Sequence, residues 1–187
     1  MVKKMESCVF ISGRGSNLKS IIESSSYNNF PIKVSLIISN NVKAEGIKYA
    51  KKHNIPFKYY SSKNQNFFEK SCINELKKKK IKFICLAGFM KVLSKKFIKT
   101  FGYKILNIHP SLLPKYRGLD THKRVLLNKE KYSGCTVHYV TPEVDSGNVI
   151  LQKKVKIIKN ETITSLAKKI LMEEKKLYSK AIKLVLK

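Results

Sequence analysis

Short apolar runs alternate with longer amphipathic runs through the first hundred residues, and this alternation constrains the fold more than any other feature. Residues 7–12 and 33–39 are nearly continuous apolar runs, which is typical of strands buried on both faces of a sheet. The segments that follow them space their apolar residues as an amphipathic helix does. Strands alternating with helices predict an α/β fold with a mostly parallel, twisted sheet flanked by helices on both faces.

The predicted elements follow one another closely, without a linker rich in Pro, Gly or Ser, so we expect a single domain over residues 1–187. The predicted strands are 7–12, 33–39, 57–60, 82–87, 104–109, 134–140 and 148–155. The predicted helices are 17–24, 43–53, 66–80, 121–128 and 162–186. The last two strands are expected to form an antiparallel pair across the loop between them.

The charge of the chain is unusual, because 39 lysines and arginines face 12 acidic residues and give a net charge of +27. Such a field attracts anions. Only Arg14, Arg117 and Arg124 are arginines, whereas proteins that read bases rely on arginine forks. The lysines are spread over nearly every segment, so we interpret them as compositional drift and predict no specific nucleic-acid partner.

Other global features indicate a cytoplasmic protein. No apolar run approaches the roughly 18 residues of a membrane span, so no membrane contact is expected. The four cysteines are far apart in sequence and lie in apolar surroundings, which predicts buried free thiols and no metal site.

The glycine-rich segment 12–17, Ser-Gly-Arg-Gly-Ser-Asn, lies between a predicted strand and a predicted helix. Its glycines allow a tight turn with exposed N–H groups, and the helix start adds a positive end, which together favour phosphate binding. Leu18 stands where a dinucleotide fingerprint would have its third glycine. The alternative is a plain turn in which Ser16 or Asn17 caps the helix.

Two polar residues end the predicted strand 104–109. Asn107 and His109 are two residues apart and therefore point to the same face of the sheet. An amide donor and an imidazolium are groups that stabilise a developing oxyanion. Asp145, in a turn after a later strand, could hold and charge the histidine. The alternatives are a core histidine and an ordinary turn aspartate.

The segment after the strand 82–87 carries Gly88 and then a run of large apolar residues, which could line a slot for a flat ligand or simply close the core. Taken in order, the segments of this chain resemble the phosphoribosylglycinamide formyltransferases, a family within the folate-dependent formyltransferase superfamily. The resemblance covers about residues 6–180. It is carried by 11–18, 86–90, 106–114, Gly118-Leu119, Thr121-His122, 134–138, Val144-Asp145 and 149–152.

The resemblance implies a Rossmann-like formyltransferase fold with a phosphate- and nucleotide-binding half, 1–100, and a catalytic and folate-binding half, 101–187. It implies transfer of the formyl group of 10-formyltetrahydrofolate, a co-substrate, to the amine of glycinamide ribonucleotide in purine biosynthesis, without a metal. Both partners would be small molecules, and the enzyme a monomer or homodimer.

The resemblance also implies roles for individual residues. The catalytic set is Asn107, His109 and Asp145. The ribonucleotide would be bound by Gly15, Ser16 and Asn17 at its phosphate and by Glu174 at its ribose. The folate would be bound by Met90, Lys91, Val92, Leu93, Asn107, Thr141, Val144 and Asp145.

The chain departs from the family pattern at a few positions. Asp120 replaces a common histidine, Ser146 a common glycine, and Gln65 lies near an arginine of some members; the chain also ends early, at Lys187. Two sister enzymes, methionyl-tRNA formyltransferase and formyltetrahydrofolate deformylase, carry an extra domain for which we expect no room here. A basic nucleic-acid-binding module on an inactive fold is a further alternative, and the intact catalytic set argues against it.

Overall fold

The computed structural model describes residues 4–187, so the first three residues of the predicted domain lie outside the described range. The strands are β1 Met5–Ile11, β2 Ile32–Ser39, β3 Phe57–Tyr59, β4 Phe83–Leu86, β5 Lys104–His109, β6 Tyr132–Tyr139 and β7 Val149–Lys156. The helices are α1 Ser16–Ser26, α2 Ile47–Lys52, α3 Gln65–Lys78, α4 Lys95–Phe101, α5 Thr121–Leu127 and α6 Ile163–Val185.

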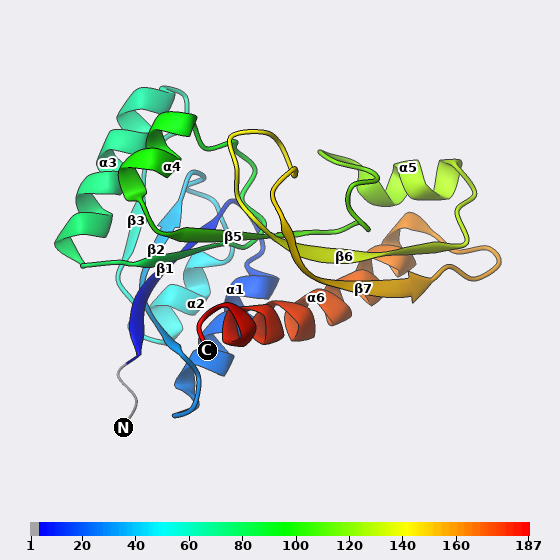
Figure 1. The fold of residues 1–187 in the computed structure, drawn as a ribbon, viewed down its shortest axis with the longest axis horizontal. Helices are drawn as coiled ribbons and strands as arrows, with labels where there is room; N and C mark the ends of the chain where they lie inside the picture. The colour runs from blue at the N-terminus through cyan, green and yellow to red at the C-terminus, as the bar shows by residue number, and fades with distance from the viewer. Residues whose placement is uncertain (1–3) are drawn as a thin grey trace.

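All seven strands form one sheet in the order β3-β2-β1-β4-β5-β6-β7. Strands β1 to β5 pair in parallel, and β6 and β7 pair antiparallel, which confirms the predicted fold class (Figure 1). Strand β6 also runs antiparallel to β5, so the direction changes between these two strands. The carboxyl ends of β1, β4 and β5 meet at one edge of the sheet, where ligands bind in folds of this kind.

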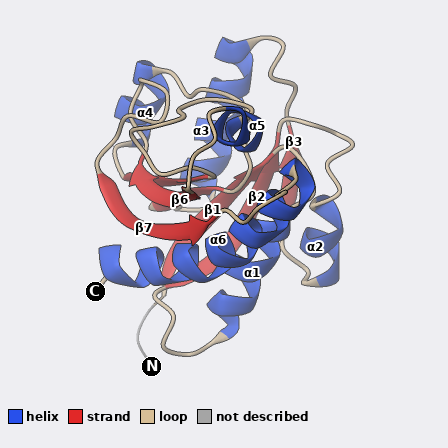
Figure 2. Ribbon diagram, turned by 90° about the vertical axis from the view of Figure 1, so that its right-hand side faces the viewer, coloured by secondary structure: helices blue, strands red, loops and turns tan. Residues whose placement is uncertain are grey.

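Helices cover both faces of the sheet (Figure 2). On one face α3 and α4 pack through Phe68, Cys72 and Phe97 against strand residues such as Phe10. On the other face α1 and α6 pack against a second cluster that includes Val9. Because both faces are covered, the central strands are buried along most of their length, which explains their uninterrupted apolar sequences.

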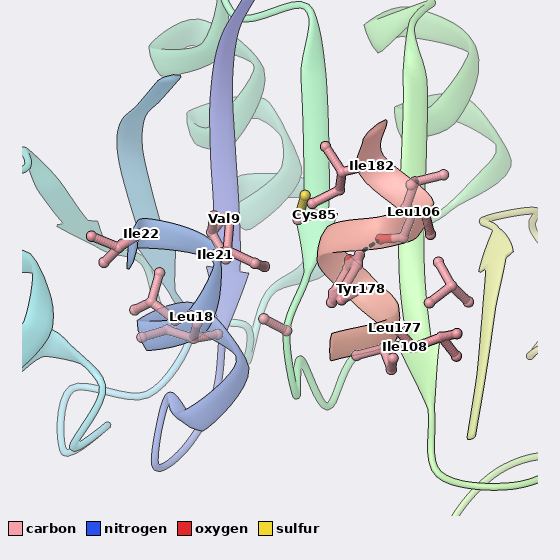
Figure 3. Close-up of a cluster of buried hydrophobic side chains, with 14 of the residues drawn as sticks. Val9, Leu18, Ile21, Ile22, Cys85, Leu106, Ile108, Leu177, Tyr178 and Ile182 are labelled. Carbon is pink, nitrogen blue, oxygen red and sulfur yellow. Dashed lines mark hydrogen bonds between the residues drawn. The ribbon is translucent and has the colours of Figure 1, made fainter. Parts of the chain in front are cut away.

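Helix α6 is the longest element and anchors the second face. Its N-cap is Thr162, whose side chain and that of Ser165 form the reciprocal bonds of a capping box. The hydroxyl of Tyr178 lies 2.9 Å from the carbonyl oxygen of Leu106 (Figure 3). It also lies 3.0 Å from the carbonyl oxygen of Leu86. These bonds tie α6 to β4 and β5 near the edge where ligands are expected.

Helix α4 is absent from the sequence prediction, because lysines at three of its seven positions obscure the apolar pattern. Its buried residues are Phe97 and Phe101, one helical turn apart, and Ser94 caps its start by accepting a hydrogen bond from the N–H of Phe97. Elsewhere the predicted helix 43–53 is shorter than expected and begins at Ile47, after Gly46.

All four cysteines are buried and free, as predicted. Within residues 4–187, no helix is long and apolar enough to cross a membrane.

Candidate functional site

The glycine-rich loop leads from β1 into α1 with Gly15 at the N-cap position and no side-chain cap, so the predicted alternative of a Ser16 or Asn17 cap is wrong. Gly15 has φ +73°, and a Cβ there would lie 2.5 Å from the Cα of Gly46. Only glycine fits this position. Because the first N–H groups of α1 have no acceptor within the helix, the loop offers them to an anion.

Helix α6 meets the glycine-rich loop through two buried side chains. The Nδ2 amide of Asn17 donates a hydrogen bond of 2.8 Å to Oε2 of Glu174. Burial raises the pKa of Glu174 to about 7, and the bond from Asn17 acts in the opposite direction. Oδ1 of Asn17 is buried and accepts no bond from residues 4–187. The structure therefore brings together two of the four predicted ribonucleotide-binding residues, Asn17 and Glu174.

The structure also brings Asn107, His109 and Asp145 together at the carboxyl end of β5. Nδ1 of His109 lies 3.2 Å from Oδ2 of Asp145, and Nδ2 of Asn107 donates to Oδ1 of Asp145 at 3.2 Å. The backbone N–H of Gly118 donates to Oδ2 of Asp145 at 2.9 Å. Asp145 is thus fixed between β5 and the loop that contains Gly118, more firmly than an ordinary turn residue.

Both ring nitrogens of His109 face acceptors. Nε2 lies 2.8 Å from the carbonyl oxygen of Tyr116, and Nδ1 faces the carboxylate of Asp145. Only the imidazolium has a proton for each contact. Burial nevertheless lowers the pKa of His109, while the Tyr116 carbonyl and the charge of Asp145 oppose that shift. Asp145 raises the pKa of His109, as the sequence predicts, but the loss of water around the buried ring lowers the pKa by more.

The pKa of Asp145 reflects the same contacts. Partial burial raises it, but hydrogen bonding to His138 and to the N–H of Gly118, together with the charge of His109, lowers it below its usual value. Asp145 is therefore a carboxylate at neutral pH.

Sequence reasoning gave no role to His138, although it lies in this cluster. Its Nε2 is 3.1 Å from Nδ2 of Asn107 and 3.5 Å from Oδ1 of Asp145. Asn107 and His138 are directly paired across β5 and β6. A prediction that the strand 134–140 pairs antiparallel with the strand 104–109 would have placed His138 beside Asn107. The sequence predicted antiparallel pairing only between the last two strands.

The segment after β4 carries the predicted folate-binding residues 90–93. The side chains of Met90 and Val92 are 63% and 51% exposed, which is unusual for large apolar groups, and Lys91 is also exposed. Leu93, in contrast, is buried in the core, so the structure does not present its side chain on the surface. The segment follows β4, which lies between β1 and β5 in the sheet.

The loop after β6 carries three further predicted folate-binding residues, Thr141, Val144 and Asp145. Val144 is 47% exposed, and the hydroxyl of Thr141 contacts that of Ser146 at 2.8 Å within the loop. Among residues 4–187, no group of three or more His, Cys, Asp or Glu side chains is placed to hold a metal ion.

The chain is similar to known proteins over nearly its whole length. The profile of the formyl transferase family matches residues 5–182. The phosphoribosylglycinamide formyltransferase of Haemophilus influenzae is 40% identical over 178 residues, which cover 94% of this chain and 84% of that protein. The human trifunctional purine biosynthetic protein adenosine-3 is 36% identical over 186 residues, which cover 98% of this chain and 18% of that protein.

Solved structures show the same fold. A phosphoribosylglycinamide formyltransferase from Anaplasma phagocytophilum superposes with a TM-score of 0.93 at 36% identity, covering 98% of this chain and 87% of that one. Glycinamide ribonucleotide transformylase 1 from Symbiobacterium toebii gives 0.94 at 33% identity, with 98% and 88% covered. The chain spans 13 to 18% of the length of four trifunctional relatives.

Proposed function

Because this chain belongs to the formyl transferase family, we propose that it transfers the formyl group of 10-formyltetrahydrofolate to the amine of glycinamide ribonucleotide in purine biosynthesis. The observation that carries the proposal is the cluster of Asn107, His109 and Asp145 at the carboxyl end of β5. We propose further that the enzyme acts in the cytoplasm, as a monomer or homodimer.

The cluster has the groups that formyl transfer needs. The amine nitrogen attacks the formyl carbon, and a tetrahedral intermediate with an oxyanion forms. Asn107 donates to the oxyanion, and the imidazolium of His109 stabilises it. Asp145 favours the charged form of His109 against the effect of burial, and it takes the amine proton, directly or through water. When the carbon–nitrogen bond to the folate breaks, His109 supplies the proton that the departing nitrogen requires.

Substrate binding must open part of this cluster. Nδ2 of Asn107 already contacts both His138 and Asp145, and both nitrogens of His109 face protein acceptors. An oxyanion near Asn107 would therefore replace one of these contacts rather than add to them. The charge of the intermediate compensates for the lost bond, so the exchange favours the transition state over the bound substrate.

The two substrates would approach the cluster from different sides. The N–H groups at Gly15, Ser16 and Asn17 would bind the ribonucleotide phosphate, with Glu174 at the ribose hydroxyls. The exposed residues Met90, Lys91 and Val92 would form one wall of the folate site, with Leu93 contributing through its backbone. Thr141 and Val144 would lie on the other side of the folate, on the loop that also carries Asp145.

The test is the release of tetrahydrofolate from 10-formyltetrahydrofolate, followed by absorbance with and without glycinamide ribonucleotide. We expect release only when the ribonucleotide is present. If the rate of tetrahydrofolate release does not depend on the ribonucleotide but increases with charged initiator tRNA, the chain has the activity of a different member of the superfamily. Release with water as the only acceptor would indicate a deformylase.

A further inference from the structure

A buried carboxylate lies behind the exposed segment 90–92. Glu69, in α3, is only 7% exposed, and none of the ion pairs formed by residues 4–187 includes it. Its oxygens accept hydrogen bonds from the backbone N–H of Ser94 at 2.8 Å, from the hydroxyl of Ser94, and from Nε2 of Gln65 at 3.1 Å. A buried charge is costly unless its bonds are satisfied, and here neutral donors satisfy it.

These bonds fix the far end of the segment. The hydroxyl of Ser94 also accepts the N–H of Phe97, so the residue that Glu69 holds is the N-cap of α4. Gln65 donates from the same amide nitrogen to the carbonyl oxygen of Val92 at 3.2 Å. Glu69 therefore sets the position of Ser94 and, through Gln65, that of Val92.

The near end of the segment is fixed independently. The N–H of Met90 donates to the hydroxyl of Ser12 at 2.8 Å. The ring of Phe89 stacks on that of Phe68 at 5.9 Å between centroids and packs edge-on against Phe10 at 5.3 Å. Phe89 and Leu93 thus point inward, and the residues between them are held outward.

We propose that Glu69 is a positioning residue that pre-organises segment 90–92 to receive the folate, an inference that rests on the proposed function. Met90 and Val92 are more than half exposed and belong to neither apolar cluster, so packing of their side chains does little to fix the segment, and its conformation depends on the hydrogen bonds behind it. Without Glu69, the segment would sample other conformations, and binding would cost the free energy of ordering it. The ribonucleotide side of the site, at α1, has no bond to Glu69 and should be unaffected.

The test compares Glu69→Gln with the parent protein. The substitution keeps the size of the side chain but replaces one acceptor oxygen by a donor group, which opposes the donors of Ser94 and Gln65. Binding of tetrahydrofolate is measured by calorimetry, and KM is measured for each substrate. We expect the dissociation constant of tetrahydrofolate and the KM for the formyl-folate substrate to rise about tenfold, because an ordering cost of this kind is of that size. The KM for the ribonucleotide should stay unchanged.

A matched control is Glu45→Gln, which removes an exposed carboxylate whose side chain is 65% exposed, and should change neither KM. Ser94→Ala, which removes only the hydroxyl, should weaken folate binding in the same direction by a smaller factor. If Glu69→Gln does not fold, Gln65→Ala tests the same chain of contacts and should raise the folate KM alone.

Unchanged folate affinity in a folded Glu69→Gln variant would overturn the proposal, as would an equal rise in both KM values, which would indicate a general loss of structure. Failure of the proposed function is a separate result, because the parent protein itself would then neither bind tetrahydrofolate nor release it in the presence of the ribonucleotide.

Discussion

The glycine-rich loop and the cluster at the end of β5 use different groups: the loop uses its backbone, and the cluster uses side chains. The glycine-rich loop presents backbone N–H groups, and its shape depends on the absence of a side chain at Gly15. The cluster at the end of β5 depends on the charge of Asp145 and on its effect on the buried ring of His109. Substrate binding at the loop should therefore be sensitive to added side-chain atoms. Activity at the cluster should be sensitive to a change of charge, even when the shape of the cluster is preserved.

The largest effect is expected from Asp145→Asn, which keeps the shape of the cluster and removes its charge. Loss of one stabilising partner of the transition state lowers kcat by about 100- to 1,000-fold, so we expect a fall in that range. Steady-state kinetics with both substrates at saturation measure it. The KM for the ribonucleotide should change little, because the glycine-rich loop does not contact Asp145. A variant with nearly the parental kcat would contradict the assigned role.

Substitution of Gly15 by valine tests the glycine-rich loop. The new Cβ meets the backbone of Gly46 at 2.5 Å, and the left-handed φ of +73° is strained for a branched side chain. We expect a loss of about 3 kcal/mol in the free energy of unfolding and a selective rise in the KM for the ribonucleotide. The control is Gly13→Ala, because a Cβ at Gly13 meets nothing within 4 Å. If both variants behave alike, or if the folate KM rises instead, the loop does not bind the phosphate.

Glu174 is an exception to this division, because it is a titratable side chain that contacts the glycine-rich loop. Burial raises its pKa to about 7, so the folded state binds a proton that the unfolded state has lost above pH 4.5. The contribution of Glu174 to the free energy of unfolding should therefore fall as pH rises, by about 2 kcal/mol between pH 5 and 7. Glu174→Gln should lose this dependence, which urea unfolding of both proteins at several pH values would show. Parallel curves would mean that Glu174 titrates normally.

The parallel part of the fold could be predicted from the sequence because strands buried on both faces leave uninterrupted apolar runs. The juxtaposition of Asn107 and His109 was equally predictable, since it depends only on the two-residue period of a strand. Helix α4 escaped prediction because it is short and its two buried residues, Phe97 and Phe101, lie among lysines.

Other features of the site depend on tertiary structure that no local pattern encodes. The position of His138 follows from the antiparallel pairing of β6 with β5. His109 contacts the carbonyl of Tyr116, a non-glycine residue that has a left-handed φ of +58° in the loop after β5. The lowered pKa of His109 arises from burial, whereas sequence reasoning could weigh only the charge of Asp145.

The central claim is that Asp145 acts through the charge of His109, and nuclear magnetic resonance titration of the His109 ring tests it most directly. His109→Asn identifies the His109 signal, and the titration is run in the parent and in Asp145→Asn. The parent pKa should lie below the ordinary value of 6.5, because the ring is buried. Removal of the nearby negative charge destabilises the imidazolium, so the pKa should be lower still in Asp145→Asn. An unchanged or higher pKa in the variant would contradict the account.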